Sequence, residues 1–394
     1  MVSVSLSYRG FYSENLQTTI CPKKAARIPL TSKLVGILIF RIKTGMRMIK
    51  RNIQKSGDSS VNLQAENITV NTGLSIAHVK EIALDVFEDN FHKLAGVAKE
   101  SADQRAKEIT DQVLKELSEK NPFGLKTFQD PDFQYSLFQA QKEYARSGDK
   151  ELGDILVDIL VDRSKEEERT LLQLVLNESL LIAPKLNSAQ LDLLACCFSI
   201  NYTTKTNIAN LQMFTDFLDD FIFVFADAVG VKDSNYKHIE YVGCGVIRAG
   251  AIDIVDILMS TYKAIFCKGF HRDQLEEISR ETPNIHNVLT VCGNNTRFLQ
   301  AKGMDDEVTR ALCKQQSISV ESTNKLLQLN NSRMMNKDEA TDFLKSICPK
   351  FDDFLKNAAN SSFNYLDLTS VGIAIAHAHS RKKTGLDAEL SIWI

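Results

Sequence analysis

Residues 147–200 contain the densest helical spacing of apolar residues in this chain. Apolar positions recur there at intervals of three and four, which places each set on one face of a helix. The three sets are Leu152, Ile155, Leu156, Ile159 and Leu160, then Leu171, Leu174, Val175, Glu178 and Leu181, and finally Leu191, Leu194 and Ala195. Pro184 ends the second helix, and Asn187-Ser188 offers a cap for the third. Three helices joined by short connections predict a compact helical hub.

Composition supports a mainly α fold for the rest of the chain. Only seven prolines and eighteen glycines occur in 394 residues, which disfavours a turn-rich β protein. The 44% hydrophobic and 25% charged content is typical of a globular protein of two or three units. We expect five segments: a disordered basic extension (1–47), a short β tag (48–72), a long helix (73–121), a helical hub with a winged-helix-like end (122–270), and a mainly helical region with a terminal strand (271–394).

The charges are unevenly distributed along the chain. Residues 1–55 hold eleven Lys/Arg and one acid, a charge of +10, whereas the remainder holds 36 basic and 49 acidic residues, a charge of −13. An acidic body disfavours general nucleic-acid binding, because phosphate contacts need a positive face. The apolar run 34–40 is too short to cross a bilayer, so no transmembrane segment is expected. The extension is either a basic arm or sequence upstream of a start at Met46 or Met48.

Eight cysteines show no CxxC pair and no regular spacing. Several of them lie in apolar helical runs, as Cys196 and Cys197 do. We therefore expect buried, reduced thiols in a cytoplasmic protein, in place of a disulfide or zinc framework.

The tag begins with turn residues at 56–58 and continues with strand-like alternation. Apolar side chains at 61, 63, 68 and 70 alternate with polar ones, which is the periodicity of a strand. Some of the polar side chains are uncharged amides, which can form ladders when identical strands stack. One hypothesis is that this strand pairs with copies of itself or with a partner's sheet edge. The alternative is an edge strand that folds back on its own domain. The candidate interaction residues here are Asn62, Gln64, Asn67 and Thr69.

Ser75 is a plausible cap for a helix that runs to Asn121-Pro122. Unbroken, this helix would be about 65 Å long at 1.5 Å per residue, more than most single domains cover. We expect its second half to be a coiled-coil seam or a solvated arm, with Ile109, Val113 and Leu117 as further interaction candidates. Gly96 offers the alternative of two shorter helices.

Two further helices and a terminal strand complete the expected C-terminal region. Asn336 or Asp338 is expected to start a helix that carries phenylalanines, and Thr369 to cap a helix over 370–379 that is buried on several sides. The β-like ending 390–394 is expected to pair near Val246-Ile247.

Possible chemical sites are few, and each has a structural explanation. On a helix His377 and His379 point about 200° apart and cannot readily share a metal. Asp154, Asp158 and Asp162 lie on one helix face, where a solvated face is favoured over a metal cluster. We therefore predict no catalytic, cofactor-binding or metal-binding residue.

Cys244 lies between Gly243 and Gly245, with His238 and Tyr241 upstream. This arrangement fits a tight turn as well as a thiol nucleophile. The helical set at 211–221 and the segment 238–247, which passes from a helix through these glycines into a β-like run, have the outline of a winged-helix-type unit.

Several motifs follow one another in this part of the chain: Gly-Asp-x-Glu-Leu (148–152), two helices, Pro-x-Leu-Asn-Ser-Ala-Gln-Leu (184–191) and Tyr-Val-Gly (241–243). This order resembles a module of uncharacterised bacterial proteins. Some of those proteins are associated with abortive infection and phage defence. The Gly-Asp-x-Ser-x-Asn-x-Gln-Ala tag (57–65) is similar to tags of bacterial conflict-system proteins, although Glu66-Asn67 departs from the usual pattern. The ending 368–394 is similar to that of an uncharacterised bacterial family covering 48–394. The resemblance implies a class of protein and no active site.

The leading expectation is a non-enzymatic, self-associating bacterial accessory protein that acts through protein–protein contacts, with phage defence as its setting. Its partner would be a second copy or another protein. One alternative is a nucleic-acid-binding regulator that uses the winged-helix-like unit, which the absence of basic residues at 188–200 disfavours. A second alternative is an enzyme of unknown class.

Overall fold

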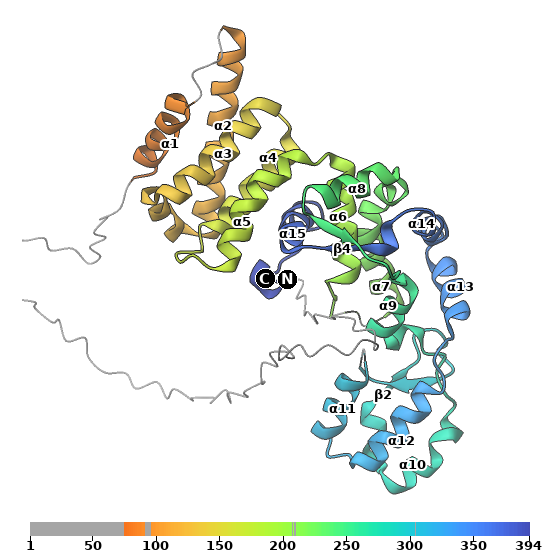
Figure 1. Ribbon diagram of the computed structural model, residues 1–394. Helices are drawn as coiled ribbons and strands as arrows, with labels where there is room; N and C mark the ends of the chain where they lie inside the picture. The colour runs from red at the N-terminus through yellow and green to blue at the C-terminus, as the bar shows by residue number, and fades with distance from the viewer. Residues whose placement is uncertain (1–74, 91–95, 207, 209, 304) are drawn as a thin grey trace, which may run out of the picture. The chain divides into compact units, whose positions relative to one another are not determined.

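The computed structural model describes residues 75–394 except 91–95, 207, 209 and 304 (Figure 1). The predicted basic extension and β tag lie outside these residues, and so do Asn62, Gln64, Asn67 and Thr69. Among the described helices none is long and apolar enough to cross a membrane.

The first described layer consists of three α-helices and one 3₁₀ helix. These are α1 (Ile76–Asn90), α2 (Val97–Lys120), η1 (Pro122–Gln129) and α3 (Pro131–Ser147). Helix α2 starts after Gly96, whose φ of 61° lies in the left-handed region. The alternative of two shorter helices is therefore correct, and α1 packs beside α2 and α3. The Oγ of Ser75 accepts a hydrogen bond from the backbone N–H of His78 (3.3 Å), as expected for a residue that starts α1.

The three hub helices form where capping residues and apolar spacing predict them. They are α4 (Lys150–Arg163), α5 (Leu171–Ile182), followed by η2 (Ala183–Lys185), and α6 (Ser188–Asn201). Asp149 caps α4 by accepting from the N–H groups of the next turn, and Thr170 caps α5 in the same way. Asn187 and Gln190 form a reciprocal capping box at the start of α6. The three helices predicted for the hub are therefore present.

After the hub the chain continues through short helices into a strand. These elements are α7 (Leu211–Phe217), the π-helical η3 (Leu218–Ile222), η4 (Phe223–Gly230), α8 (Asp233–Tyr241), β1 (Gly245–Ile247), α9 (Ile254–Thr261) and η5 (Lys263–Phe266). Strand β1 pairs antiparallel with β4 (Leu366–Leu368), which is distant in the sequence. The strand pair is therefore not the hairpin of a winged-helix unit.

Residues 270–329 enclose a smaller hydrophobic core of their own. Its elements are η6 (Arg272–Leu275), α10 (Glu276–Glu281), η7 (Pro283–Val288), β2 (Leu289–Val291), β3 (Leu299–Ala301), α11 (Asp306–Gln315) and α12 (Val320–Asn331). Strands β2 and β3 form an antiparallel pair.

The C-terminal elements return to the main core. They are α13 (Lys337–Ile347), α14 (Lys350–Ala359), η8 (Phe363–Tyr365), β4, α15 (Ser370–Thr384) and η9 (Leu390–Ile392). Asn336 caps α13 and Thr369 caps α15, as the sequence predicts. The expected terminal strand is wrong, because residues 390–392 form a 3₁₀ turn that buries Leu390 and Trp393.

Helix α15 packs against α4, α5 and α6, and Figure 1 shows it beside the hub helices. Residues 372–380 of α15 are buried, although they include two histidines and a serine. Helix α15 therefore brings polar side chains into the centre of the fold, which makes it the first place to look for a site.

Candidate functional site

The apolar stripe of α2 is covered by the chain itself. Ile109, Val113 and Leu117 are at most 1% exposed and belong to the main core. Helices α3 and α4 pack along α2 and cover this stripe. Residues 97–120 therefore do not form the expected coiled-coil seam, and these three side chains are not available to a partner.

Arg381 of α15 lies between two buried carboxylates of α4. Its Nη1 is 2.9 Å from Asp158 Oδ2 and 3.2 Å from Asp162 Oδ2. The side chains of Asp158 and Asp162 are 0% and 7% exposed, so the expectation of a solvated acidic face at these positions is wrong. The sequence could not reveal this, because the neutralising charge comes from a helix more than 200 positions away.

Burial and charge shift these two carboxyl groups in opposite directions. Burial raises the pKa of Asp158, and Arg381 only partly offsets it. Burial also acts to raise the pKa of Asp162, but Arg381 and Lys165 outweigh it, so that the net pKa shift is downward. Lys165 Nζ lies 2.9 Å from Asp162 Oδ1, which gives Asp162 a second cation.

His377 lies at the edge of this cluster. Its ring is 0% exposed, and its Nε2 is 2.8 Å from the carbonyl oxygen of Ala388, to which the protonated nitrogen donates. Burial, together with the neighbouring Arg381, lowers the pKa of His377 to about 4. The imidazole is therefore neutral at neutral pH and serves to hold the segment after α15.

His379 belongs to a separate cluster on the other side of α15. Its Nε2 is 2.7 Å from Asp192 Oδ1, and Lys383 Nζ lies 2.7 Å from the same oxygen and 3.1 Å from Glu151 Oε1. The two histidines thus contact different acids and share no site, as their spacing predicts.

Each of the two clusters brings one histidine and two carboxylates within reach of one another. In both, a basic side chain, Arg381 or Lys383, already lies among the carboxylate oxygens. A cation bound there would meet this positive charge. The arrangement fits structural ion pairs between helices better than a metal centre.

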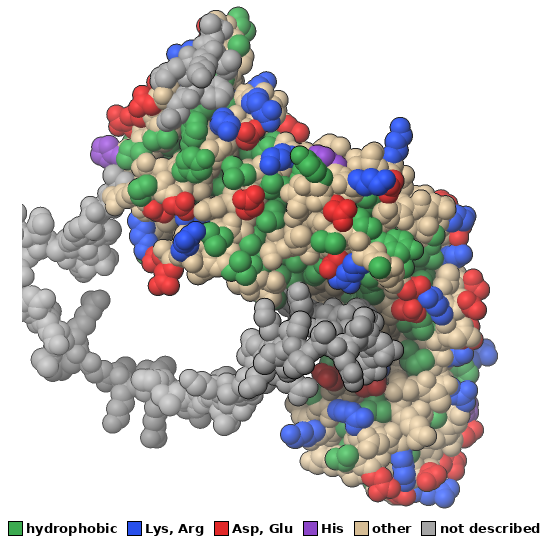
Figure 2. Space-filling model, in the orientation of Figure 1, with side chains coloured by type: hydrophobic (Ala, Val, Ile, Leu, Met, Phe, Trp, Pro, Cys, Tyr) green, Lys and Arg blue, Asp and Glu red, His purple; other side chains and the backbone are tan. Residues whose placement is uncertain are grey.

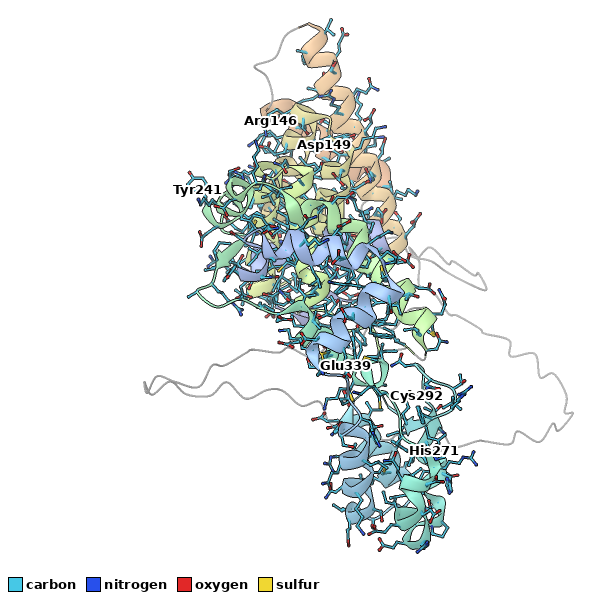
Figure 3. The ribbon with its side chains drawn as sticks, turned by 90° about the vertical axis from the view of Figure 1, so that its right-hand side faces the viewer. Arg146, Asp149, Tyr241, His271, Cys292 and Glu339 are labelled. Carbon is cyan, nitrogen blue, oxygen red and sulfur yellow. The ribbon has the colours of Figure 1, made fainter. Side chains whose placement is uncertain are left out.

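Cys244 is not placed for nucleophilic chemistry. Its thiol is fully buried, and burial raises its pKa to about 12, so the thiolate is not formed at neutral pH. His238 bonds with Gln190 (2.9 Å), and Tyr241 is 86% exposed and points outward (Figure 3). The tight-turn interpretation of these residues therefore holds. The seven cysteines within the described residues are buried and free.

Helix α6 cannot act as an exposed recognition helix. Nearly all of its residues from Gln190 to Ile200 are buried, and it packs against α15 and η4. A helix that reads a DNA groove must present its side chains to solvent. The position of α6 therefore removes the main support for the nucleic-acid interpretation.

Helix α5 exposes an apolar face that the sequence assigned to the core. Leu171, Leu174 and Leu181 are 62%, 42% and 40% exposed. Most of the remaining circumference is buried and includes Val175, Leu176, Leu180 and Ile182. Figure 2 shows hydrophobic side chains at the surface where α5 lies, with charged side chains around them. The missed signal is that α5 is apolar on nearly its whole circumference.

Glu178 is an exposed charge on the same side of α5 as these leucines, and Arg169 is an exposed charge that precedes the helix. Arg169 precedes the cap of the helix, and Glu178 lies between Leu174 and Leu181. Over the part of the chain that the structure describes, neither side chain forms an ion pair. We call Leu171, Leu174, Glu178 and Leu181 the α5 face.

These features define a mainly helical protein whose buried charges join helices and whose α5 face is open to solvent. A model of an uncharacterised protein family matches residues 73–394, and the chain belongs to that family. No curated protein and no solved structure matches the chain.

Proposed function

We propose that the protein is a non-enzymatic, self-associating accessory protein that acts through protein–protein contacts. The observation that carries this proposal is the exposure of three leucines on one side of α5. A surface helix normally turns its apolar face to the core and its polar face to water. A helix that is apolar on both sides has a second face to bury, and contiguous exposed apolar surface is typical of an interaction site.

The surroundings of the titratable groups support a non-enzymatic role. His377, His379 and the carboxylates beside them are held in ion pairs and hydrogen bonds that join α4, α6 and α15. Such networks perturb pKa values for structural reasons as well as catalytic ones. A cytoplasmic location is part of the proposal and agrees with the buried, free cysteines.

Sedimentation of the whole chain tests self-association directly. Between about 1 and 100 µM the weight-average mass is expected to rise above that of a monomer, because a small interface gives a weak complex. A monomeric mass over the whole range would contradict self-association.

The resemblance to abortive-infection modules suggests phage defence as the biological setting. A bacterial host that expresses the chain is expected to yield fewer phage plaques than the same host with an empty vector. Equal plaque numbers over a panel of unrelated phages would contradict this part of the proposal and leave the question of self-association to the sedimentation experiment.

A further inference from the structure

Residues 386–394 lie along α15, and we call them the strap. Helix α15 ends at Gly385, whose φ of 68° lies in the left-handed region and lets the chain turn back. The strap, all of which the structure describes, contains one 3₁₀ turn and pairs with no strand. It is therefore held by its side chains and by single hydrogen bonds. The side chains that it buries are Leu386, Leu390 and Trp393.

Two polar contacts attach the strap to the hub. Glu389 Oε2 lies 2.8 Å from Nζ of Lys165, which follows α4. The indole Nε1 of Trp393 donates to the carbonyl oxygen of Tyr202, at the end of α6 (2.8 Å). The strap thus connects α4, α6 and α15 across the place where these helices meet.

His377 lies beneath the strap. Its Nε2 donates to the carbonyl oxygen of Ala388 (2.8 Å), and its ring centroid is 5.4 Å from that of Trp393. The ring of Phe198, from α6, lies 6.1 Å away. The imidazole is 0% exposed, so the strap is part of the cover that keeps water away from it.

The docked strap leaves a second proton on His377 without an acceptor. Within the described residues, Nδ1 of this histidine is buried and has no hydrogen-bond partner. Protonation would therefore create a buried, charged N–H group that neither water nor protein satisfies.

The charged groups around His377 oppose protonation on balance. Arg381 Nη2 lies 3.4 Å from His377 Nε2 and repels an imidazolium. The nearby carboxylates attract it, but each of them already has a cation. They are Asp158 and Asp162 of α4, which pair with Arg381, and Glu389 of the strap, which pairs with Lys165.

The other helices packed on α15 add no charge at this place. Asp192 of α6 bonds with His379, which belongs to the separate cluster of α15. The one charged residue of α5 is Glu178, which is exposed. Only removal of the strap brings water to the imidazole without separating the helices.

We propose that the strap is released by acid: uptake of one proton by His377 detaches residues 386–394 from α15 while the helices of the hub stay folded. In the released form the imidazolium is hydrated, which the docked form prevents. This device is independent of the proposed self-association, because it involves a different part of the molecule.

The size of the effect follows from the two protonation equilibria of His377. Burial, together with Arg381, holds its pKa at about 4 in the docked form, against 6.5 for a free histidine. Protons therefore bind the released form more tightly. The ratio of released to docked strap should rise about 20-fold between pH 7 and pH 5.

Hydrogen exchange of the full chain, measured by mass spectrometry, detects this release even when the released form is rare. The probes are the backbone amides of Ile392 and Trp393, which the docked strap holds in its 3₁₀ turn. After correction for the pH dependence of intrinsic exchange, their protection should fall about 20-fold from pH 7 to pH 5. At both pH values it should stay at least about tenfold below that of peptides from α4 and α6, since the strap opens without them.

Two histidine variants show which residue takes up the proton. His377→Gln keeps a donor for the Ala388 oxygen and cannot titrate, so protection of the strap should change less than about twofold between the two pH values. His379→Gln is the matched control, because it removes a buried histidine of the same helix that contacts Asp192 (2.7 Å) and not the strap. This control should keep the fall seen in the parent.

The parent chain also gives a measurement that needs no variant. Uptake of a single proton requires protection of the strap to fall about sevenfold from pH 6 to pH 5. The emission of Trp393, the one tryptophan of the chain, should shift to longer wavelength over the same range while circular dichroism stays constant.

Three results would overturn the proposal. Constant protection of the strap from pH 7 to pH 5 would show that acid does not release it. A fall that persists in His377→Gln would assign the proton to another group. Equal protection of the strap and of the α4 and α6 peptides would mean that the strap opens only when the whole protein unfolds.

Discussion

A β-carbon on residue 372 would lie 1.8 Å from the backbone carbonyl oxygen of Cys244. Gly372 is in the first turn of α15, and this turn rests directly on the backbone at Gly243 and Cys244. The contact is completed by Thr369, whose backbone N–H donates to the Cys244 oxygen (3.1 Å) and whose hydroxyl donates to the Gly243 oxygen (2.6 Å). Close packing here sets the distance between α15 and the start of β1.

Gly372→Ala should therefore destabilise the fold by about 3 kcal/mol, because the added methyl group meets backbone that cannot rotate away. Urea unfolding followed by the fluorescence of Trp393, the one tryptophan of the chain, measures the change. Gly250→Ala is the control, since a β-carbon there has open space and the effect should stay within about 0.5 kcal/mol. Equal effects of the two substitutions would contradict the close approach of Gly372 to the backbone of Cys244.

Arg381→Met should cost about 3–5 kcal/mol of unfolding free energy, because it leaves Asp158 and Asp162 buried without their main counter-charge. Chemical denaturation at neutral pH gives the value. Arg280→Met serves as the control, as the Arg280–Glu276 pair (3.2 Å) has side chains that are 79% and 64% exposed. Exposed pairs contribute at most about 1 kcal/mol. A stable Arg381→Met protein would mean that the two aspartates do not need this cation.

His377 should make stability depend on pH between about 4 and 6.5. The folded protein holds its pKa at about 4, below the reference value of 6.5, so the unfolded chain binds a proton first as pH falls. Stability is then complete above pH 6.5 and decreases toward pH 4, by about 3 kcal/mol in total from this group.

His377→Gln keeps a donor for the Ala388 oxygen and removes the titration. A plot of unfolding free energy against pH should therefore be flatter for this variant than for the parent between pH 4 and 6.5. Both proteins keep Arg381, Asp158, Asp162 and Lys165, and also Glu389, whose Oε2 lies 2.8 Å from Lys165 Nζ. The difference between the two curves therefore isolates the histidine. Parallel curves for the parent and His377→Gln would show that His377 does not cause this pH dependence.

The residues that start helices were predictable because capping is a local interaction. Asn187, Asn336 and Thr369 each accept a hydrogen bond from the backbone N–H three positions ahead, so neighbouring residues are sufficient to specify them. The same is true of the α4 stripe, whose apolar residues are buried as their spacing predicts.

The orientation of α5 was not predictable in this way. Its apolar residues lie around most of the helix, so periodicity selected Leu171, Leu174, Val175, Glu178 and Leu181 as the inner face. Of the apolar residues in this set the fold buries only Val175, together with Leu176 and Leu180. Ile109, Val113 and Leu117 of α2 had the opposite outcome. The sequence predicted that a partner would cover them, whereas α3 and α4 of the same chain do so. In both cases the error concerns which neighbour covers a face, and not whether the helix forms.

The sequence by itself determined the mainly helical class and the helix starts, because hydrogen bonds within one turn and apolar spacing depend on adjacent residues. Only the tertiary structure decided that Arg381 neutralises Asp158, that β4 pairs with β1, and that α5 leaves three leucines in solvent. Those relationships join residues far apart in the chain. They follow from how whole helices pack together, which the spacing of residues within a single helix does not specify.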